Sequence, residues 1–131
     1  MQLKKNVPTL LFLLGAAALT LLLFSKSSPL YPLNDWVDAN CFLTTGKAVL
    51  SGKVLYRDVY EQKGPLLYFA HAAAALLSDA SFLGVWILEV LAAWAFACIG
   101  YALVRRRVPD AAPFLILGLL FLTFSTTSFA S

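Results

Sequence analysis

The sequence has few charged residues. Only 13% of its 131 residues are Asp, Glu, Lys or Arg, whereas 60% are apolar and the mean hydropathy is +0.78. Soluble domains average about 25% charged and about 45–50% apolar residues. The composition therefore excludes an ordinary soluble domain and indicates an integral membrane protein with room for a few spans and one loop.

Several kinds of site that depend on particular residue patterns are also missing. The two cysteines, Cys41 and Cys98, form no CxxC or Cys/His spacing that indicates zinc, and we interpret them as small unpaired side chains. The sequence contains no Ser/His/Asp arrangement, no glycine-rich phosphate loop and no HExxH motif. Its basic residues form no stripe with interleaved aromatics, so we expect no nucleic-acid partner.

Long apolar runs are what the sequence has instead. Residues 7–24 carry no charge and are just long enough to cross the ~30 Å hydrocarbon core, so we interpret them as an uncleaved signal anchor rather than a cleaved signal peptide. Residues 82–104 carry a single charge, Glu89, and residues 111–128 form a third run. The sequence thus predicts an all-α integral membrane protein with three transmembrane helices.

The stretch between the first two spans, residues 25–81, is the one long polar segment. Asn34 is a good N-cap, and apolar residues then follow helical spacing until Gly52 supplies a stop. This pattern predicts an amphipathic helix from Asp35 to Ser51 that lies along the membrane surface. Residues 65–77 begin with proline and are apolar, but they are too short to span, so we expect a second surface helix.

The placement of basic residues predicts the topology. Lys4 and Lys5 precede the first span, and Arg105, Arg106 and Arg107 follow the second. The positive-inside rule puts both clusters in the cytoplasm and residues 25–81 outside. We therefore expect a multi-pass cell-membrane protein with a cytoplasmic N-terminus and an extracytoplasmic loop. Because no polar tail precedes Ser131, the ending looks like a cut through a larger protein.

Two carboxylates at the start of the first surface helix are the leading candidates for chemistry. Asp35 and Asp38 are three residues apart, a spacing that makes them neighbours on a helix. Such a pair can take a proton from an incoming hydroxyl or bind a metal. The alternative is that both charges only complement the helix dipole.

Basic and intramembrane residues supply further candidates. Arg57, Lys63 and Lys53 lie in the same loop and suit a phosphate group, unless they are ordinary solvated or headgroup-facing charges. Glu89 is an acid inside a span, which is either functional or reaches the interface. His71 lies in an alanine-rich stretch and is interpreted as a packing or hydrogen-bonding residue.

The order of these motifs resembles the first extracytoplasmic loop of the GT-C membrane glycosyltransferases. The branch in question contains the protein O-mannosyltransferases, the lipid A aminoarabinose transferase and bacterial relatives. The resemblance rests on Asp38 with Phe42 one turn later, on Tyr56-Arg57-Asp58 and on Lys63-Gly64-Pro65. It implies transfer of a sugar from a polyprenyl-phosphate donor to an acceptor glycan, lipid or protein outside the membrane.

The resemblance also implies roles for residues. Asp38 matches the family's catalytic carboxylate more closely than Asp35 does, and Lys63, with Arg57, matches the segment that contacts the donor phosphate. Ala39 stands where many members carry an acid, and this departure counts against a second carboxylate there and against metal dependence; no cofactor is certain, and a divalent metal is an open alternative. The family has many more helices, so residues 1–131 are expected to be an N-terminal part that is inactive alone.

A non-enzymatic membrane subunit or a transporter fragment is the alternative. Broken helices and an acid at the middle of the bilayer, such as Glu89, would favour a transporter. The feature that separates the two readings is whether the carboxylate and the lysine converge on one outward-facing cavity.

Overall fold

A computed structural model describes the backbone of residues 3–31 and 33–129 and the side chains of residues 7–31 and 33–126. Within these residues the chain is all-helical, as predicted, with five helices and no strand. They are α1 (Leu3–Phe24), α2 (Val37–Leu50), α3 (Pro65–Leu77), α4 (Leu83–Val104) and α5 (Ala112–Phe129). Some residues of the sequence analysis lie outside this description. They are the side chains of Lys4 and Lys5, the whole of Pro32 in the linker, and the side chains of the last two residues of the third expected span, 127–128.

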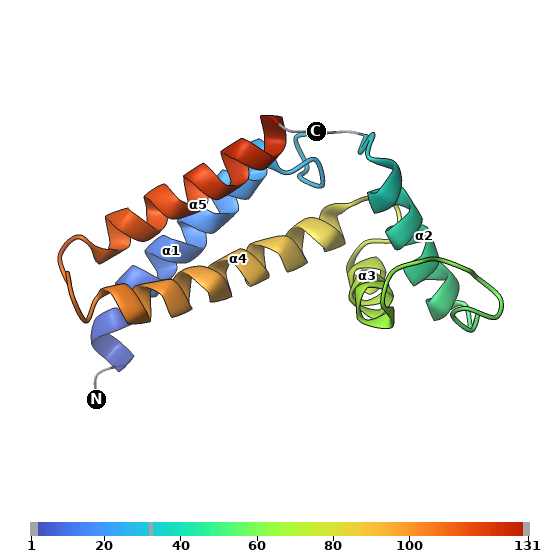
Figure 1. Cartoon of the computed structure of the whole chain (residues 1–131), viewed down its shortest axis with the longest axis horizontal. Coiled ribbons are helices and arrows are strands. Elements are labelled where there is room, and N and C mark those ends of the chain that lie inside the picture. The colour runs from blue at the N-terminus through green and yellow to red at the C-terminus, as the bar shows by residue number, and fades with distance from the viewer. Residues whose placement is uncertain (1–2, 32, 130–131) are drawn as a thin grey trace. The chain divides into compact units, whose positions relative to one another are not determined.

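The chain divides into two compact units, and the first comprises Met1–Ser25 and Glu89–Ser131. In this unit α5 runs beside α1 (Figure 1). Each of the two helices buries residues spaced four apart, which places them along one face. These residues are Leu13, Ala17 and Leu21 in α1 and Ala112, Ile116 and Leu120 in α5. The Trp94 indole N–H of α4 donates to the Leu10 carbonyl at 3.0 Å.

Two helices, α1 and α4, are long and apolar enough to cross a membrane. Only 22% of the apolar window of α1 and 17% of that of α4 are buried, whereas the core helix of a soluble protein is mostly buried. Both helices therefore present bare apolar surface, as a lipid-facing helix does. The apolar stretch of α5, Ala112–Thr126, is shorter, so the third expected span is not one of the helices that are long and apolar enough to cross a membrane.

The second unit, Lys26–Leu88, contains α2, α3 and the first residues of α4. The helices α2 and α3 pack against each other (Figure 1), and their backbones come close together at Gly46. A Cβ atom at Gly46 would lie 2.6 Å from the Ala72 backbone nitrogen, so only glycine fits this crossing. The small apolar core consists of Leu43, Ala74, Ala75 and Val85.

Local signals explain where these helices begin and end. The expected helix over residues 65–77 is observed with the same bounds, because Gly64 is extended and Pro65 occupies the first position, where a missing N–H costs nothing. The predicted stop of α2 is also confirmed. Gly52 has a φ of +86°, and the N–H groups of Gly52 and Lys53 donate back to the carbonyls of Val49 and Ala48.

Candidate functional site

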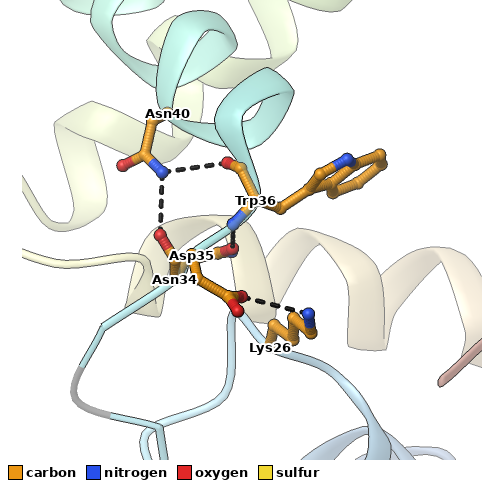
Figure 2. A network of polar contacts seen from close by, with 5 residues as sticks. All are labelled: Lys26, Asn34, Asp35, Trp36 and Asn40. Atoms are coloured by element: carbon orange, nitrogen blue, oxygen red, sulfur yellow. Dashed lines mark hydrogen bonds and ion pairs between the residues drawn. The ribbon is translucent and has the colours of Figure 1, made fainter. Parts of the chain in front are cut away.

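The start of α2 differs from the expected one. The helix begins at Val37, with Trp36 as an extended N-cap residue that has no side-chain capping bond. The Asn34 side-chain oxygen instead accepts the Trp36 N–H at 3.1 Å, and the Asn40 amide donates to the carbonyls of Asn34 and Trp36 (Figure 2). The prediction that Asn34 is the N-cap is therefore wrong. Asn readily forms such local turns with its own backbone, and this one delays the helix.

The expected pairing of Asp35 with Asp38 on one helix is also wrong. Asp35 precedes the helix and lies 3.0 Å from the Lys26 ammonium group (Figure 2). The hydrogen bond from Lys26 holds the pKa of Asp35 below its usual range. Asp35 is thus an exposed, ion-paired carboxylate in an extended segment, and it is not positioned by the first turn of α2.

Asp38 lies in the first turn of α2 and is exposed. It makes no hydrogen bond or ion pair with any residue that the structure describes, unlike the other three aspartates of the second unit. Their pairs are Lys26–Asp35 at 3.0 Å, Arg57–Asp58 at 2.8 Å and Lys47–Asp79 at 3.3 Å. The side chain of Asp38 is therefore available to an incoming group, and the N-terminal end of the helix favours its negative charge.

Arg57 belongs to a tightly hydrogen-bonded turn. Its guanidinium donates to both carboxylate oxygens of Asp58, at 2.8 and 2.9 Å, and this contact keeps the pKa of Asp58 below its usual range. Asp58 also accepts the Val54 N–H at 2.8 Å. Tyr56 has a φ of +65°, which is uncommon for a residue other than glycine, and its N–H bonds to the Val59 carbonyl. Asp58 occupies two of the five guanidinium N–H groups of Arg57, so the others can reach a phosphate while the ion pair stays in place.

Lys63 is held by its backbone and not by its side chain. Its N–H donates to the Tyr68 hydroxyl at 3.0 Å, and its carbonyl accepts the Tyr56 hydroxyl at 2.8 Å. Tyr68 is fully buried, and burial raises its pKa. The Lys63 ammonium group has no hydrogen-bond or ion-pair partner among residues 7–31 and 33–126. Two tyrosines therefore fix the position of the lysine and leave its charge free.

Contacts across the α2–α3 interface connect Phe42 with the backbone of Lys63. Phe42 lies one turn after Asp38, and its ring centroid is 6.3 Å from that of Tyr68, the residue whose hydroxyl holds Lys63. The Phe42 ring also lies 5.6 Å from the His71 ring. These contacts cross the α2–α3 interface, so the geometry of that interface sets where the carboxylate and the lysine stand relative to each other.

An open depression of about 380 Å³ lies over the N-terminal half of α2. Asp35 and Glu61 contribute its acidic groups, together with residues of α2 that include Asn40, Cys41 and Thr44. Glu61 is two residues before Lys63, so the depression places this part of the loop beside the start of α2. Neither Asp38 nor Lys63 lines it, and the predicted convergence of the two on one cavity is not observed here.

His71 and Glu89 have structural partners, whereas the Lys53 ammonium group has none among the residues whose side chains the structure describes. His71 bonds through its Nδ1 to the Leu67 carbonyl at 2.9 Å, in agreement with a packing and hydrogen-bonding role. Glu89 accepts the Ser25 hydroxyl at 2.6 Å within the first unit. No group of three or more His, Cys, Asp or Glu residues that could hold a metal ion occurs in the described part of the chain.

The sequence analysis did not identify the two tyrosines that hold Lys63. A local signal exists for Tyr68, because it follows Pro65 by one turn and so returns to the side of the helix start. No local signal exists for Lys47 and Asp79, which come from distant parts of the sequence.

Comparisons with protein-family models, with curated proteins and with solved structures found no match.

Proposed function

We propose that this chain is the N-terminal part of a GT-C type membrane glycosyltransferase. The complete enzyme would move a sugar from a polyprenyl-phosphate donor to an acceptor on the outer side of the membrane. The observation that carries the proposal is the free carboxylate of Asp38, in a unit whose other aspartates are all ion-paired. A general base needs such freedom, because a carboxylate bound to a cation is a weaker proton acceptor.

The chemistry uses the unpaired charges of Asp38 and Lys63. Asp38 accepts the proton of the acceptor hydroxyl, whose oxygen then attacks the anomeric carbon of the donor sugar. The bond from that carbon to the phosphate oxygen breaks, and the polyprenyl phosphate leaves with the electron pair. Lys63 stabilises the negative charge that develops on the phosphate, and the two tyrosine contacts pre-organise its backbone for this role.

Arg57 and Asp35 have supporting roles in this proposal. The guanidinium of Arg57 joins the phosphate through the N–H groups that do not bind Asp58. Asp35 is bound to Lys26, so it is not a second base. The sugar, the acceptor and the involvement of a divalent metal follow from the resemblance only.

The membrane placement that we propose has three spans, with the N-terminus in the cytoplasm and the second unit outside. One exposed face of α3 supports it, because every residue on that face is apolar. The face consists of Leu66, Phe69, Ala70, Ala73, Leu76 and Leu77. The opposite face packs on α2 through Tyr68 and Ala72. A helix that is apolar on its exposed face suits the outer acyl boundary of a bilayer.

The alternative, a transporter fragment, has less support. Transporter sites are typically built where a helix is broken near the middle of the bilayer. In contrast, α4 is a continuous helix through Glu89, whose carboxylate accepts a hydroxyl from Ser25.

The test is sugar transfer from labelled polyprenyl-phosphate sugars, in membranes that contain the product of the complete gene. Asp38→Asn keeps the shape of the side chain but removes the base, so transfer should fall by ~10² or more. Asp35→Asn should have a smaller effect, and Asp110→Asn, which changes an exposed aspartate after α4, should have none. Equal and mild losses for Asp38→Asn and Asp35→Asn would remove Asp38 from its role.

A further inference from the structure

A cavity of about 510 Å³ lies in the second unit, and neither Asp38 nor Lys63 lines it. Its walls come from the linker before α2, from α2 and from the turn between α3 and α4. Small-molecule sites usually have volumes of about 300–1,000 Å³ and combine apolar walls with a few polar groups. The cavity is therefore large enough for a small ligand, and its lining determines which kind.

Hydroxyl and amide groups dominate the polar part of the lining. They belong to Ser27, Ser28, Asn34, Asn40, Thr44 and Ser81. Three of these groups make no hydrogen bond within the described residues: the Asn34 amide nitrogen, the Asn40 amide oxygen and the Thr44 hydroxyl. Together they offer both donors and acceptors, as a ligand with several hydroxyl groups requires.

The cavity offers no free charge. Lys47 is the one charged residue that lines it, and its ammonium group is bound to the carboxylate of Asp79 at 3.3 Å and to the Asp79 carbonyl. Because Asp79 neutralises the charge of Lys47, an anionic ligand would gain little attraction, and a cationic ligand would meet no free carboxylate in the lining. The lining therefore favours an uncharged ligand. Tyr31 and Phe82 add aromatic surface on which the C–H groups of a sugar ring can pack.

The walls of the cavity are held in place before any ligand arrives. The Ser81 hydroxyl bonds to the Ser78 hydroxyl at 2.8 Å and accepts the Leu83 N–H at 3.3 Å. The amide nitrogen of Asn40 donates to the carbonyls of Asn34 and Trp36, which fixes the linker against α2 (Figure 2). Such pre-organisation lowers the entropy that a ligand must lose on binding.

We infer that this cavity binds an uncharged polyhydroxylated group, either a free sugar or the sugar headgroup of a lipid. The inference is independent of the proposed transfer reaction, because the cavity contains neither the base nor the lysine. Asp38→Asn should consequently leave sugar binding unchanged. This separates a failure of the proposed function from a failure of the binding site.

The experiment uses the chain in lipid nanodiscs and saturation-transfer NMR with glucose, mannose and the charged sugar glucuronate. A second arm uses nanodiscs that contain a monoglucosyl diacylglycerol. We expect a neutral sugar, free or lipid-borne, to bind with a dissociation constant of about 1 mM or weaker. Thr44→Val removes one hydroxyl without changing the shape of the side chain, and Asn34→Ala removes the free amide. Each should weaken binding about threefold to tenfold.

Thr9→Val makes the same chemical change in α1, outside the cavity, and serves as the matched control. Binding of the free hexose would show that the ligand is a soluble sugar, and binding of the glycolipid alone would show that it is a lipid headgroup. Either result supports the site if Thr44→Val weakens the binding. The inference is wrong if no neutral sugar binds in either arm, if glucuronate binds equally well, or if Thr44→Val and Thr9→Val have the same effect.

Discussion

Replacing Gly46 by alanine tests whether the close crossing of α2 and α3 sets the geometry of the site. An added Cβ would lie 2.6 Å from the Ala72 nitrogen and 2.7 Å from the His71 carbonyl carbon, both of them backbone atoms of α3. Ordinary contact begins at 3.4 Å, so the helices must separate by about 0.8 Å. A backbone atom cannot turn away as a flexible side chain does, and the whole interface must therefore move.

The cost follows from two opposing effects. Overpacking of this kind destabilises by ~1–3 kcal/mol, while alanine gains ~0.8–1 kcal/mol over glycine inside a helix. These ranges give a net loss of up to ~2 kcal/mol in the stability of the second unit, or up to about a 30-fold rise in its opening equilibrium. The Phe42–Tyr68 contact spans this interface, so the same shift should move Asp38 relative to Lys63.

Hydrogen exchange read by mass spectrometry measures this loss helix by helix. Gly46→Ala should speed exchange in peptides from α2 and α3 and leave α1 and α5 unchanged. Gly118→Ala is the matched control, because a Cβ atom there meets no atom within 4 Å. It should leave exchange unchanged or slow it slightly. Unchanged exchange in α2 and α3 of Gly46→Ala would show that the two helices do not pack as closely as described.

Three further predictions follow from the topology, the ion pairs and the open surface of the site. In intact cells, a membrane-impermeant maleimide should label the exposed Cys41. A cysteine introduced by Ser81→Cys, in a chain that also carries Cys41→Ser, should be labelled as well. Labelling of either cysteine only after lysis would contradict the outer position of the loop. Lys26→Met should raise the pKa of Asp35 toward that of an ordinary aspartate in a carbon-13 NMR titration. The ion pair stabilises the fold at pH values above the unfolded-state pKa of Asp35, and this stability is lost as pH falls through the lower folded-state pKa. If the pKa of Asp35 is the same with and without Lys26, the pairing is refuted. Residues 1–131 alone should show no turnover with a labelled polyprenyl-phosphate sugar, because ligand sites enclose most of the ligand and the depression near Asp35 is open. Multiple turnovers that disappear with Asp38→Asn would contradict this prediction.

Helix positions could be read from the sequence where the deciding signal is local. The bounds of α3 follow from Gly64 and Pro65 at one end and from the polar residues after Leu77 at the other. The end of α2 follows from Gly52. The start of α2 could not be read in this way, because Asn34 and Asp35 both satisfy the rules for a helix start. The competing turn formed by Asn34, Trp36 and Asn40 decided it.

The state of each charged side chain could not be predicted from local patterns. Spacing suggested that Asp35 and Asp38 act together, but Lys26 binds one and leaves the other free. Lys47 and Asp79 are brought together only when α2 meets the turn after α3. Contacts of this kind depend on how helices pack, and helix packing is set by features such as Gly46 that have no signal in hydropathy.

The scarcity of charge makes the unpaired groups informative. A charged side chain near lipid is costly unless it is paired or hydrated, so a membrane protein with few charges is expected to pair most of them. In the second unit Lys26, Lys47 and Arg57 are all bound to aspartates, whereas Asp38, Lys53, Glu61 and Lys63 have no ion-pair partner among the described residues. Under the proposed function, Asp38 and Lys63 differ from the paired residues because their partners, an acceptor hydroxyl and a phosphate, would come from outside the chain.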